Sequence, residues 1–314
     1  MKVIFMGTPD FAVGALQAVI DAGHEVLLVV TQPDREKGRG KEVQFTPVKE
    51  CAVKSGIEVF QPLKIKTPEA VAKLKEYDAD IFVVAAFGQI LSQEILDMPK
   101  YGCVNIHASL LPKYRGAAPI QWSILDGEKE TGVTIMQMNA GLDTGDILLQ
   151  KKIEIAADET GESLFDRLAI LGAETIVEAL PLIESGSLKP VPQDDQASTY
   201  AGMLKKDMGH IDWTWDACKI ECYVRGLNSW PSAYTYLNGK QLKIWGAEVV
   251  DVINSELEGN PKPGVIYTIG KDSIDVVTGK GLLRIKSIQL EGKKRMEVSA
   301  FLLGYKLNAG DILG

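Results

Sequence analysis

The chain has 314 residues, 46% of them hydrophobic and 24% charged, and a formal net charge of -8 at pH 7. This length exceeds one typical hydrophobic core, so we expect two domains, and the balanced composition excludes an intrinsically disordered protein. The negative charge excludes a surface that is basic throughout, but nucleic-acid binding stays open because phosphate contacts need only a local basic patch.

Short apolar runs alternate with amphipathic segments over the first half of the chain. Expected strands lie at residues 2–6, 25–31, 81–86, 103–107, 131–138 and 147–155. Expected helices lie at residues 11–22, 47–55, 68–75 and 160–185. Such alternation is typical of a mostly parallel sheet with helices on both faces. The pattern therefore predicts an α/β domain, which we place at residues 1–203.

The last third of the chain has a different pattern. Residues 190–199 are rich in Pro, Asp, Gln and Ser, which is typical of a loop. The expected elements after it are a helix at 216–227 and strands at 233–237, 241–250, 265–269, 274–277 and 282–289. Short strands separated by Gly, Asn and Asp favour an OB-like β-barrel, so we place a second domain at residues 204–314.

Charge is distributed unevenly between these two parts. From Lys206 onward, 14 Lys and Arg residues stand against 13 Asp and Glu residues. All of the net negative charge therefore precedes Lys206, which favours the second domain as the part that would contact a polyanion.

The cysteines and the apolar segments bear on metals and membranes. Cys51, Cys103, Cys218 and Cys222 lack the neighbouring Cys or His that would complete a metal site, so we expect reduced thiols and no metal. The apolar run near the N-terminus is too short for a signal peptide, and no stretch reaches membrane-spanning length. We therefore expect a cytoplasmic protein with no membrane partner.

The first expected strand runs into the turn Gly7-Thr8-Pro9-Asp10-Phe11. A dinucleotide site of the G-x-G-x-x-G type needs two further glycines here, and both are missing. The sequence therefore argues against an NAD enzyme. Gly7 by itself indicates only a tight turn between a strand and a helix.

Polar residues lie at the end of the expected strand 103–107. Asn105 and His107 are two residues apart, so they share one face at the carboxyl end, where open parallel sheets bind ligands. An amide can donate and accept hydrogen bonds, and an imidazole can move a proton near neutral pH. Asp143 lies in a Gly-rich turn from which its carboxylate could pair with His107. Each has an ordinary alternative, namely a structural histidine and an aspartate that stabilises a turn.

Together these residues resemble the active-site pattern of the transferases and hydrolases that use 10-formyltetrahydrofolate. The pattern comprises Asn105, His107, Ser109-Leu110-Leu111-Pro112 and Asp143. Within that family, the chain most resembles the members that formylate methionyl-tRNA, and the resemblance covers nearly its whole length. The further matching stretches are residues 7–11, 31–35, 38–41, 115–121, 131–138, 211–213 and 230–231. The resemblance implies a Rossmann-like domain that binds folate in place of NAD.

The activity implied is transfer of a formyl group from N10 of 10-formyltetrahydrofolate to an amine. Such a site must stabilise a tetrahedral oxyanion and protonate the departing nitrogen. The implied roles are an oxyanion donor for Asn105, a second donor and proton shuttle for His107, and orientation of that ring for Asp143. The implied folate contacts are Phe87, Gly88, Gln89, Ile90, Leu91, Ser109, Leu110, Leu111 and Pro112. For Phe87 and Ile90 the alternative is plain core packing.

The acceptor implied is initiator methionyl-tRNA. Residues 35–41 carry four basic side chains after an expected strand, although a solvated loop is the alternative interpretation. In the resembling proteins this loop enters the acceptor stem, and Arg39 matches the arginine that helps to recognise its unpaired first position. The expected tRNA contacts are Arg35, Lys37, Arg39, Lys41, Lys205, Lys206, Lys293, Lys294 and Arg295.

Other functions stay open at this point. A formyltransferase for a sugar nucleotide or a purine precursor would share Asn105, His107 and Asp143, but it would have no evident use for the 35–41 segment. A formyltetrahydrofolate hydrolase would use water in place of the amine. A non-catalytic tRNA-binding protein would not need the three polar residues. We expect this protein to be a monomer.

Overall fold

The computed structural model describes residues 1–37, 42–259 and 261–314. The chain divides into two compact units. The first unit consists of Met1–Pro119, Glu130–Glu154 and Phe165–Ala201. The second consists of Ile120–Lys129, Ile155–Leu164 and Gly202–Gly314. Two short earlier segments thus belong to the second unit, and the expected boundary between residues 203 and 204 stays a prediction.

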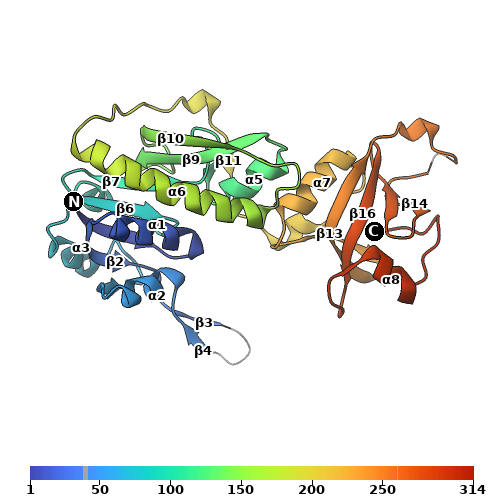
Figure 1. Cartoon of the computed structure of the whole chain (residues 1–314), viewed down its shortest axis with the longest axis horizontal. Helices are drawn as coiled ribbons and strands as arrows, with labels where there is room; N and C mark the ends of the chain where they lie inside the picture. The colour runs from blue at the N-terminus through green and yellow to red at the C-terminus, as the bar shows by residue number, and fades with distance from the viewer. Residues whose placement is uncertain (38–41, 260) are drawn as a thin grey trace. The chain divides into compact units, whose positions relative to one another are not determined.

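A seven-stranded sheet forms the centre of the first unit (Figure 1). Its order is β10 (Ile147–Glu154), β9 (Glu130–Gln137), β7 (Cys103–His107), β6 (Ile81–Ala85), β1 (Lys2–Gly7), β2 (Glu25–Val30) and β5 (Val59–Phe60). The pairs from β5 to β7 are parallel, whereas β9 is antiparallel to both β7 and β10. Strands β1 and β6 read as continuous apolar runs because helices cover both faces of the sheet.

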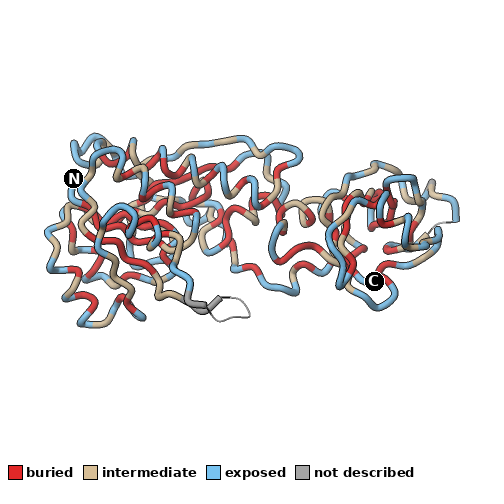
Figure 2. The backbone as a smooth tube through the Cα atoms, turned by 60° about the horizontal axis from the view of Figure 1, so that its bottom comes forward, coloured by how far each residue is buried: buried red, intermediate tan, exposed pale blue. Residues whose placement is uncertain are grey.

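The alternating side chains of β1 separate the two faces. Ile4 and Met6 join a buried cluster with apolar residues of α3 (Pro68–Lys75) and α4 (Gln93–Leu96). Two further helices, α1 (Asp10–Asp21) and α6 (Gly161–Glu184), meet where the rings of Phe11 and Phe165 pack edge to face, 5.6 Å between centroids. Helix α2 (Pro47–Lys54) packs beside α1. Figure 2 shows buried stretches of the backbone inside this unit and exposed stretches around them.

Residues near the predicted basic loop form an element that the sequence did not predict. β3 (Arg35–Lys37) and β4 (Glu42–Gln44) pair as an antiparallel ribbon. Asp34 and Lys49 form an ion pair at the base of this ribbon, and Gln61 hydrogen-bonds to both side chains. Burial alone would raise the pKa of Asp34, but the hydrogen bonds from Lys49 and Gln61 hold it below its ordinary value. These contacts therefore attach the base of the ribbon to the rest of the first unit.

An antiparallel sheet forms the second unit, beside α7 (Ala217–Gly226) and α8 (Val298–Gly304). Its order is β12 (Ala233–Leu237), β13 (Lys240–Val250), β16 (Leu282–Leu290), β15 (Ile274–Val277) and β14 (Ile266–Ile269), with β17 (Met296–Glu297) paired to β16. The C-terminal residues form hydrogen bonds at both edges of this sheet. The Leu313 N–H donates to Gly264, next to β14, and the Gly314 N–H donates to Tyr236 on β12.

The α/β class, the mostly parallel first sheet and the antiparallel second sheet are confirmed. Within residues 1–37, 42–259 and 261–314, no helix has both the length and the apolarity needed to cross a bilayer.

Candidate active site

The carboxyl end of β7 carries the two polar residues singled out by the sequence. His107 is only 5% exposed, whereas Asn105 is half-buried. No side chain or backbone group within the described ranges hydrogen-bonds to the Asn105 amide. A partly accessible amide with its hydrogen-bonding capacity unused is suited to contact a ligand.

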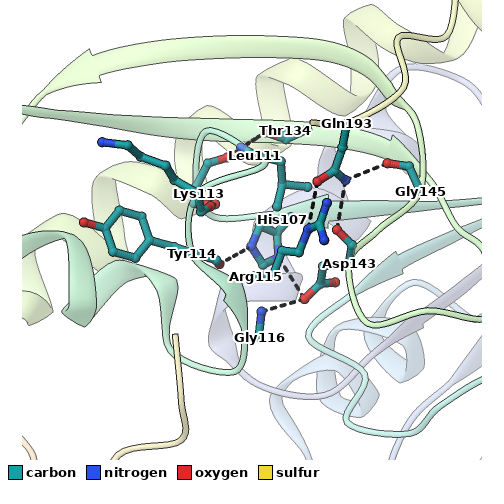
Figure 3. Close-up of polar contacts among 11 residues, drawn as sticks. His107, Leu111, Lys113, Tyr114, Arg115, Gly116, Thr134, Asp143, Gly145 and Gln193 are labelled. Atoms are coloured by element: carbon teal, nitrogen blue, oxygen red, sulfur yellow. Dashed lines mark hydrogen bonds and ion pairs between the residues drawn. The ribbon is translucent and has the colours of Figure 1, made fainter. Parts of the chain in front are cut away.

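The His107 ring is fixed through its two nitrogens (Figure 3). Nε2 lies 2.8 Å from the carbonyl oxygen of Tyr114, and because a carbonyl can only accept, Nε2 carries a hydrogen. Nδ1 lies 3.8 Å from Oδ2 of Asp143, which is too long for a direct hydrogen bond. Nδ1 is therefore the nitrogen that can exchange a proton with a substrate, with a carboxylate beside it.

Asp143 is held in an unusual backbone conformation, with φ of 51°. Its Oδ2 accepts a hydrogen bond of 2.8 Å from the Gly116 N–H. Gly116 itself, with φ of 114°, packs so closely that a Cβ would lie 2.7 Å from the carbonyl oxygen of Ala201. The His107–Asp143 pairing expected from the sequence is thus present, and the Gly116 backbone aims the carboxylate.

The turn that carries Asp143 requires glycine at position 145, where a Cβ would lie 1.7 Å from the carbonyl oxygen of Gln137. We expect Gly145→Ala to destabilise the fold by about 1–3 kcal/mol, because a rigid backbone atom must move. Turnover should fall as well, since Asp143 lies two residues away. Urea unfolding and initial-rate kinetics measure both effects.

Gly14→Ala is the matched control, because its Cβ would meet no atom closer than 3.9 Å and alanine favours the α1 helix. Wild-type stability and turnover in Gly145→Ala would show that the turn tolerates a displacement of this size.

Gln193 and Arg115 also lie beside Asp143, and the sequence did not identify either of them as a site residue. Gln193 donates through Nε2 to the carbonyl oxygens of Asp143 and Gly145, and its Oε1 accepts from Nε of Arg115 (Figure 3). The composition of residues 190–199 predicts only a loop. No local pattern marks Gln193, because its partners lie 48 to 78 residues away in the sequence.

The expected folate segment 109–112 is a tightly bonded loop after β7. Ser109 is fully buried, and its hydroxyl donates to the carbonyl of Lys113 at 2.7 Å. Thr134 on β9 donates to the Ser109 carbonyl and accepts from the Leu111 N–H. The Ser109 hydroxyl thus braces the loop, while Leu110 and Pro112 are partly exposed. Direct folate contact by this segment stays a prediction.

The other expected folate segment, residues 87–91, follows β6 on the same edge of the sheet. Phe87 and Leu91 are buried in the cluster beside α3 and α4, so core packing accounts for them. The Gln89 side chain accepts from the Ile65 N–H and donates to the Pro62 carbonyl. Gly88 has φ of 81°, and Ile90 is 66% exposed. Ile90 is thus an apolar side chain available to a ligand, and its role stays a prediction.

The expected tRNA contacts fall into three groups. Arg39 and Lys41 lie outside the described residues, and Arg35 and Lys37 are the ends of β3. In the second unit, Lys205 and Lys206 are exposed. So are Lys293, Lys294 and Arg295, which lie between β16 and β17.

An aromatic platform in the second unit was not predicted. The guanidinium of Arg295 lies 5.1 Å from the ring centroid of Trp245, and Nζ of Lys243 lies 5.5 Å from it. The indole N–H of Trp245 donates to Gln289. Aromatic rings flanked by cations are a common surface for stacking nucleic-acid bases.

Cys103 lies on the same strand as Asn105 and His107, but its thiol is fully buried. Burial raises the pKa of the Cys103 thiol to about 12, so this group stays protonated. Among the described residues, no three His, Cys, Asp or Glu side chains are grouped so that they could hold a metal ion.

Known proteins share both parts of this architecture. Residues 1–180 match the family model described as formyl transferase, and residues 203–306 match the model of the formyl transferase C-terminal domain. A methionyl-tRNA formyltransferase of Agathobacter rectalis is 55% identical, with 99% of this chain and 98% of that protein covered. A methionyl-tRNA formyltransferase of Caldanaerobacter subterraneus is 50% identical, with both chains covered in full.

Solved structures share the fold at lower identity. An N-formyltransferase from Helicobacter canadensis, solved with folinic acid and dTDP-3-aminofucose, has a TM-score of 0.68 at 19% identity, over 94% of this chain and 100% of that one. HypX from Aquifex aeolicus, solved with tetrahydrofolic acid, has a TM-score of 0.60 at 19% identity, over 99% of this chain and 50% of that one. The full-length matches at 50–55% identity show more than the fold. The chain belongs to the formyl transferase family and, within it, to the methionyl-tRNA formyltransferases.

Proposed function

We propose that this chain transfers the formyl group of 10-formyltetrahydrofolate to the free amino group of methionine on initiator methionyl-tRNA, as a cytoplasmic monomer. The observation that carries the proposal is the arrangement at the end of β7. An accessible Asn105 amide lies on the same strand as a His107 ring whose Nδ1 faces the Asp143 carboxylate. The names of full-length relatives at 50–55% identity support the choice of acceptor.

The proposed reaction forms a bond between the methionine nitrogen and the formyl carbon and breaks the bond from that carbon to N10. An α-amino group has a pKa of about 7.7, so much of it is nucleophilic at neutral pH without a strong base. Asn105 donates its amide hydrogen to the developing oxyanion. Nδ1 of His107 accepts the proton that the attacking nitrogen loses, and it then delivers that proton to N10. Asp143 stabilises the charged ring between these two transfers.

Two segments at the same edge of the sheet are the proposed folate site. The exposed Ile90 and the left-handed Gly88 follow β6, and the braced loop 109–112 follows β7. A flat ring system needs an apolar surface and backbone groups that it can approach closely, which these residues offer. Ligand contact by Phe87 and Leu91 would be through their backbone, since both side chains are buried.

Competition between acceptors tests the proposal. The enzyme receives a formyl-labelled donor with charged initiator tRNA and an amino-sugar nucleotide at equal concentrations. We expect label on the tRNA. Label mainly on the sugar would establish the alternative transferase, and labelled formate that forms equally well without an amine would establish a hydrolase.

The segment that contains Arg39 should decide which tRNA is accepted. An arginine fork can contact a phosphate and a base edge together, which lysine cannot match. We expect Arg39→Ala to lower formylation of initiator methionyl-tRNA by about 10-fold or more, the order of one lost base contact, and Arg39→Lys to restore it in part. Hydrolysis of the formyl donor without tRNA should be unchanged in both variants.

Lys189→Ala is the control for this experiment, because it removes an exposed positive charge outside the expected tRNA contacts. If Arg39→Ala formylates as well as Lys189→Ala does, residues 35–41 are a solvated loop and the alternative interpretation is correct.

A further inference from the structure

The segment 193–201 reaches the active site from far along the chain. Its end, β11 (Tyr200–Ala201), pairs in parallel with β8 (Arg115–Gly116). β8 is the dipeptide whose Gly116 N–H binds the Asp143 carboxylate. Neither Gln193 nor Thr199 in this segment has a role in the reaction proposed above, yet each bonds to a residue that touches the His107 ring. Figure 3 shows the contact of Gln193 with Asp143.

Gln193 fixes the turn on the Nδ1 side of His107. Its Nε2 donates to the carbonyl oxygens of Asp143 and Gly145, with N···O distances of 2.9 Å and 2.6 Å. Its oxygen accepts from Nε of Arg115 at 3.0 Å, so both ends of the amide are used. Left-handed backbone at a non-glycine residue is costly and persists only where surrounding contacts enforce it. Gln193 supplies such contacts at Asp143.

Thr199 fixes the backbone on the Nε2 side of His107. Its hydroxyl oxygen accepts from the Tyr114 N–H at 2.8 Å, and its carbonyl accepts from the Arg115 N–H at 2.9 Å. Tyr114 is also left-handed, with φ of 61°, and its carbonyl is the acceptor for His107 Nε2. Thr199 therefore helps to set the group that determines which ring nitrogen carries the hydrogen.

We infer that Gln193 and Thr199 are positioning residues that fix the tautomer and the orientation of His107 from its two sides. The inference rests on the proposed role of His107. A misplacement of about 1 Å in a reacting group can cost on the order of 100-fold in rate. Gln193 and Thr199 thus act on the reaction through His107, although neither side chain touches the reacting atoms.

Gln193→Glu is the sharpest variant because it preserves shape. A glutamate can still accept from Arg115, but it cannot donate to the Asp143 and Gly145 carbonyls. We expect kcat to fall by about 10–100-fold with little change in KM for either substrate. Asp195→Asn is the matched control. It alters the exposed partner of the same Arg115, whose side chain lies 2.7 Å from Asp195, and should retain wild-type kcat.

Thr199→Val tests the other side, because valine has the shape of threonine without the acceptor oxygen. We expect a loss of kcat of the same order, and we expect Thr199→Ser to restore most of it because serine retains the hydroxyl. Thermal unfolding identifies any variant whose loss is due to misfolding.

A spectroscopic readout separates positioning from general destabilisation. The chain has three histidines, so ¹⁵N signals of the His107 ring are readily assigned by comparison with His107→Gln. In the wild-type enzyme they should report hydrogen on Nε2. In Gln193→Glu and Thr199→Val they should shift or broaden, whereas in Asp195→Asn and Thr199→Ser they should match the wild type.

The outcomes distinguish this inference from the proposed function. Wild-type kcat and wild-type His107 signals in both Gln193→Glu and Thr199→Val would overturn the inference while leaving the role of His107 intact. If His107→Ala itself retains turnover, the proposed catalytic site is wrong, whatever Gln193 and Thr199 do.

Discussion

Replacement of His107 by alanine should lower turnover by about 10²–10⁴-fold, the range typical of a general acid–base group. Under the proposed mechanism, the variant has no Nδ1 to carry the proton from the amine to N10, and Asp143 has no charged ring to stabilise. Stability should also fall by about 1–3 kcal/mol, because the Tyr114 carbonyl loses its buried donor. Single-turnover kinetics with saturating tRNA measure the chemical step, and urea unfolding measures the stability.

His24→Ala is the control for loss of an imidazole, since His24 lies outside the site and contacts the N-terminal amine. Binding of charged tRNA to His107→Ala should match that of the wild type. A folded His107→Ala protein with near-normal turnover would remove the basis of the proposed mechanism.

Loss of the Asn105 amide should have the second large effect. We expect Asn105→Ala to lower kcat by about 10²–10³-fold, which is the usual cost of one oxyanion donor, with KM nearly unchanged. Unlike His107→Ala, this variant should keep wild-type stability, because no described residue loses a hydrogen bond to Asn105. The two variants thus separate catalytic loss from structural loss.

Asn105→Asp provides a second test at the same position. The carboxylate retains the shape of the amide, but it cannot donate and it places negative charge where the oxyanion develops. Its turnover should therefore be no higher than that of Asn105→Ala. An increased KM with unchanged kcat in either variant would assign Asn105 to ground-state binding.

The sheet of the first unit could be predicted from the sequence because its inner strands are covered on both faces. β1 and β6 are short apolar runs bounded by turns, and two of the helices between them begin at the Thr-Pro pairs Thr46-Pro47 and Thr67-Pro68. The β3–β4 ribbon could not be predicted because four of its six residues are charged and its short strands show no apolar alternation. Tertiary contacts at its base, such as Asp34 with Lys49, have no local signature.

The candidate site could be predicted only in part for the same reason. Asn105 and His107 lie on one strand, so their spacing reveals a shared face, and the Gly-rich turn around Asp143 suggests a loop near them. Gln193 and Thr199 contact the site across 48 to 85 residues of sequence, and such contacts leave no periodic pattern. Burial of Ser109 and Phe87 likewise depends on the completed fold.

The identity of the amino-acid product tests the central claim most directly. Purified enzyme is incubated with a ¹³C-formyl donor and charged initiator tRNA, the amino acid is released from the tRNA, and its mass is determined. We expect ¹³C-formyl-methionine with the wild-type enzyme and almost entirely unmodified methionine with His107→Ala after the same short incubation. Unmodified methionine with the wild-type enzyme, accompanied by labelled formate, would contradict it.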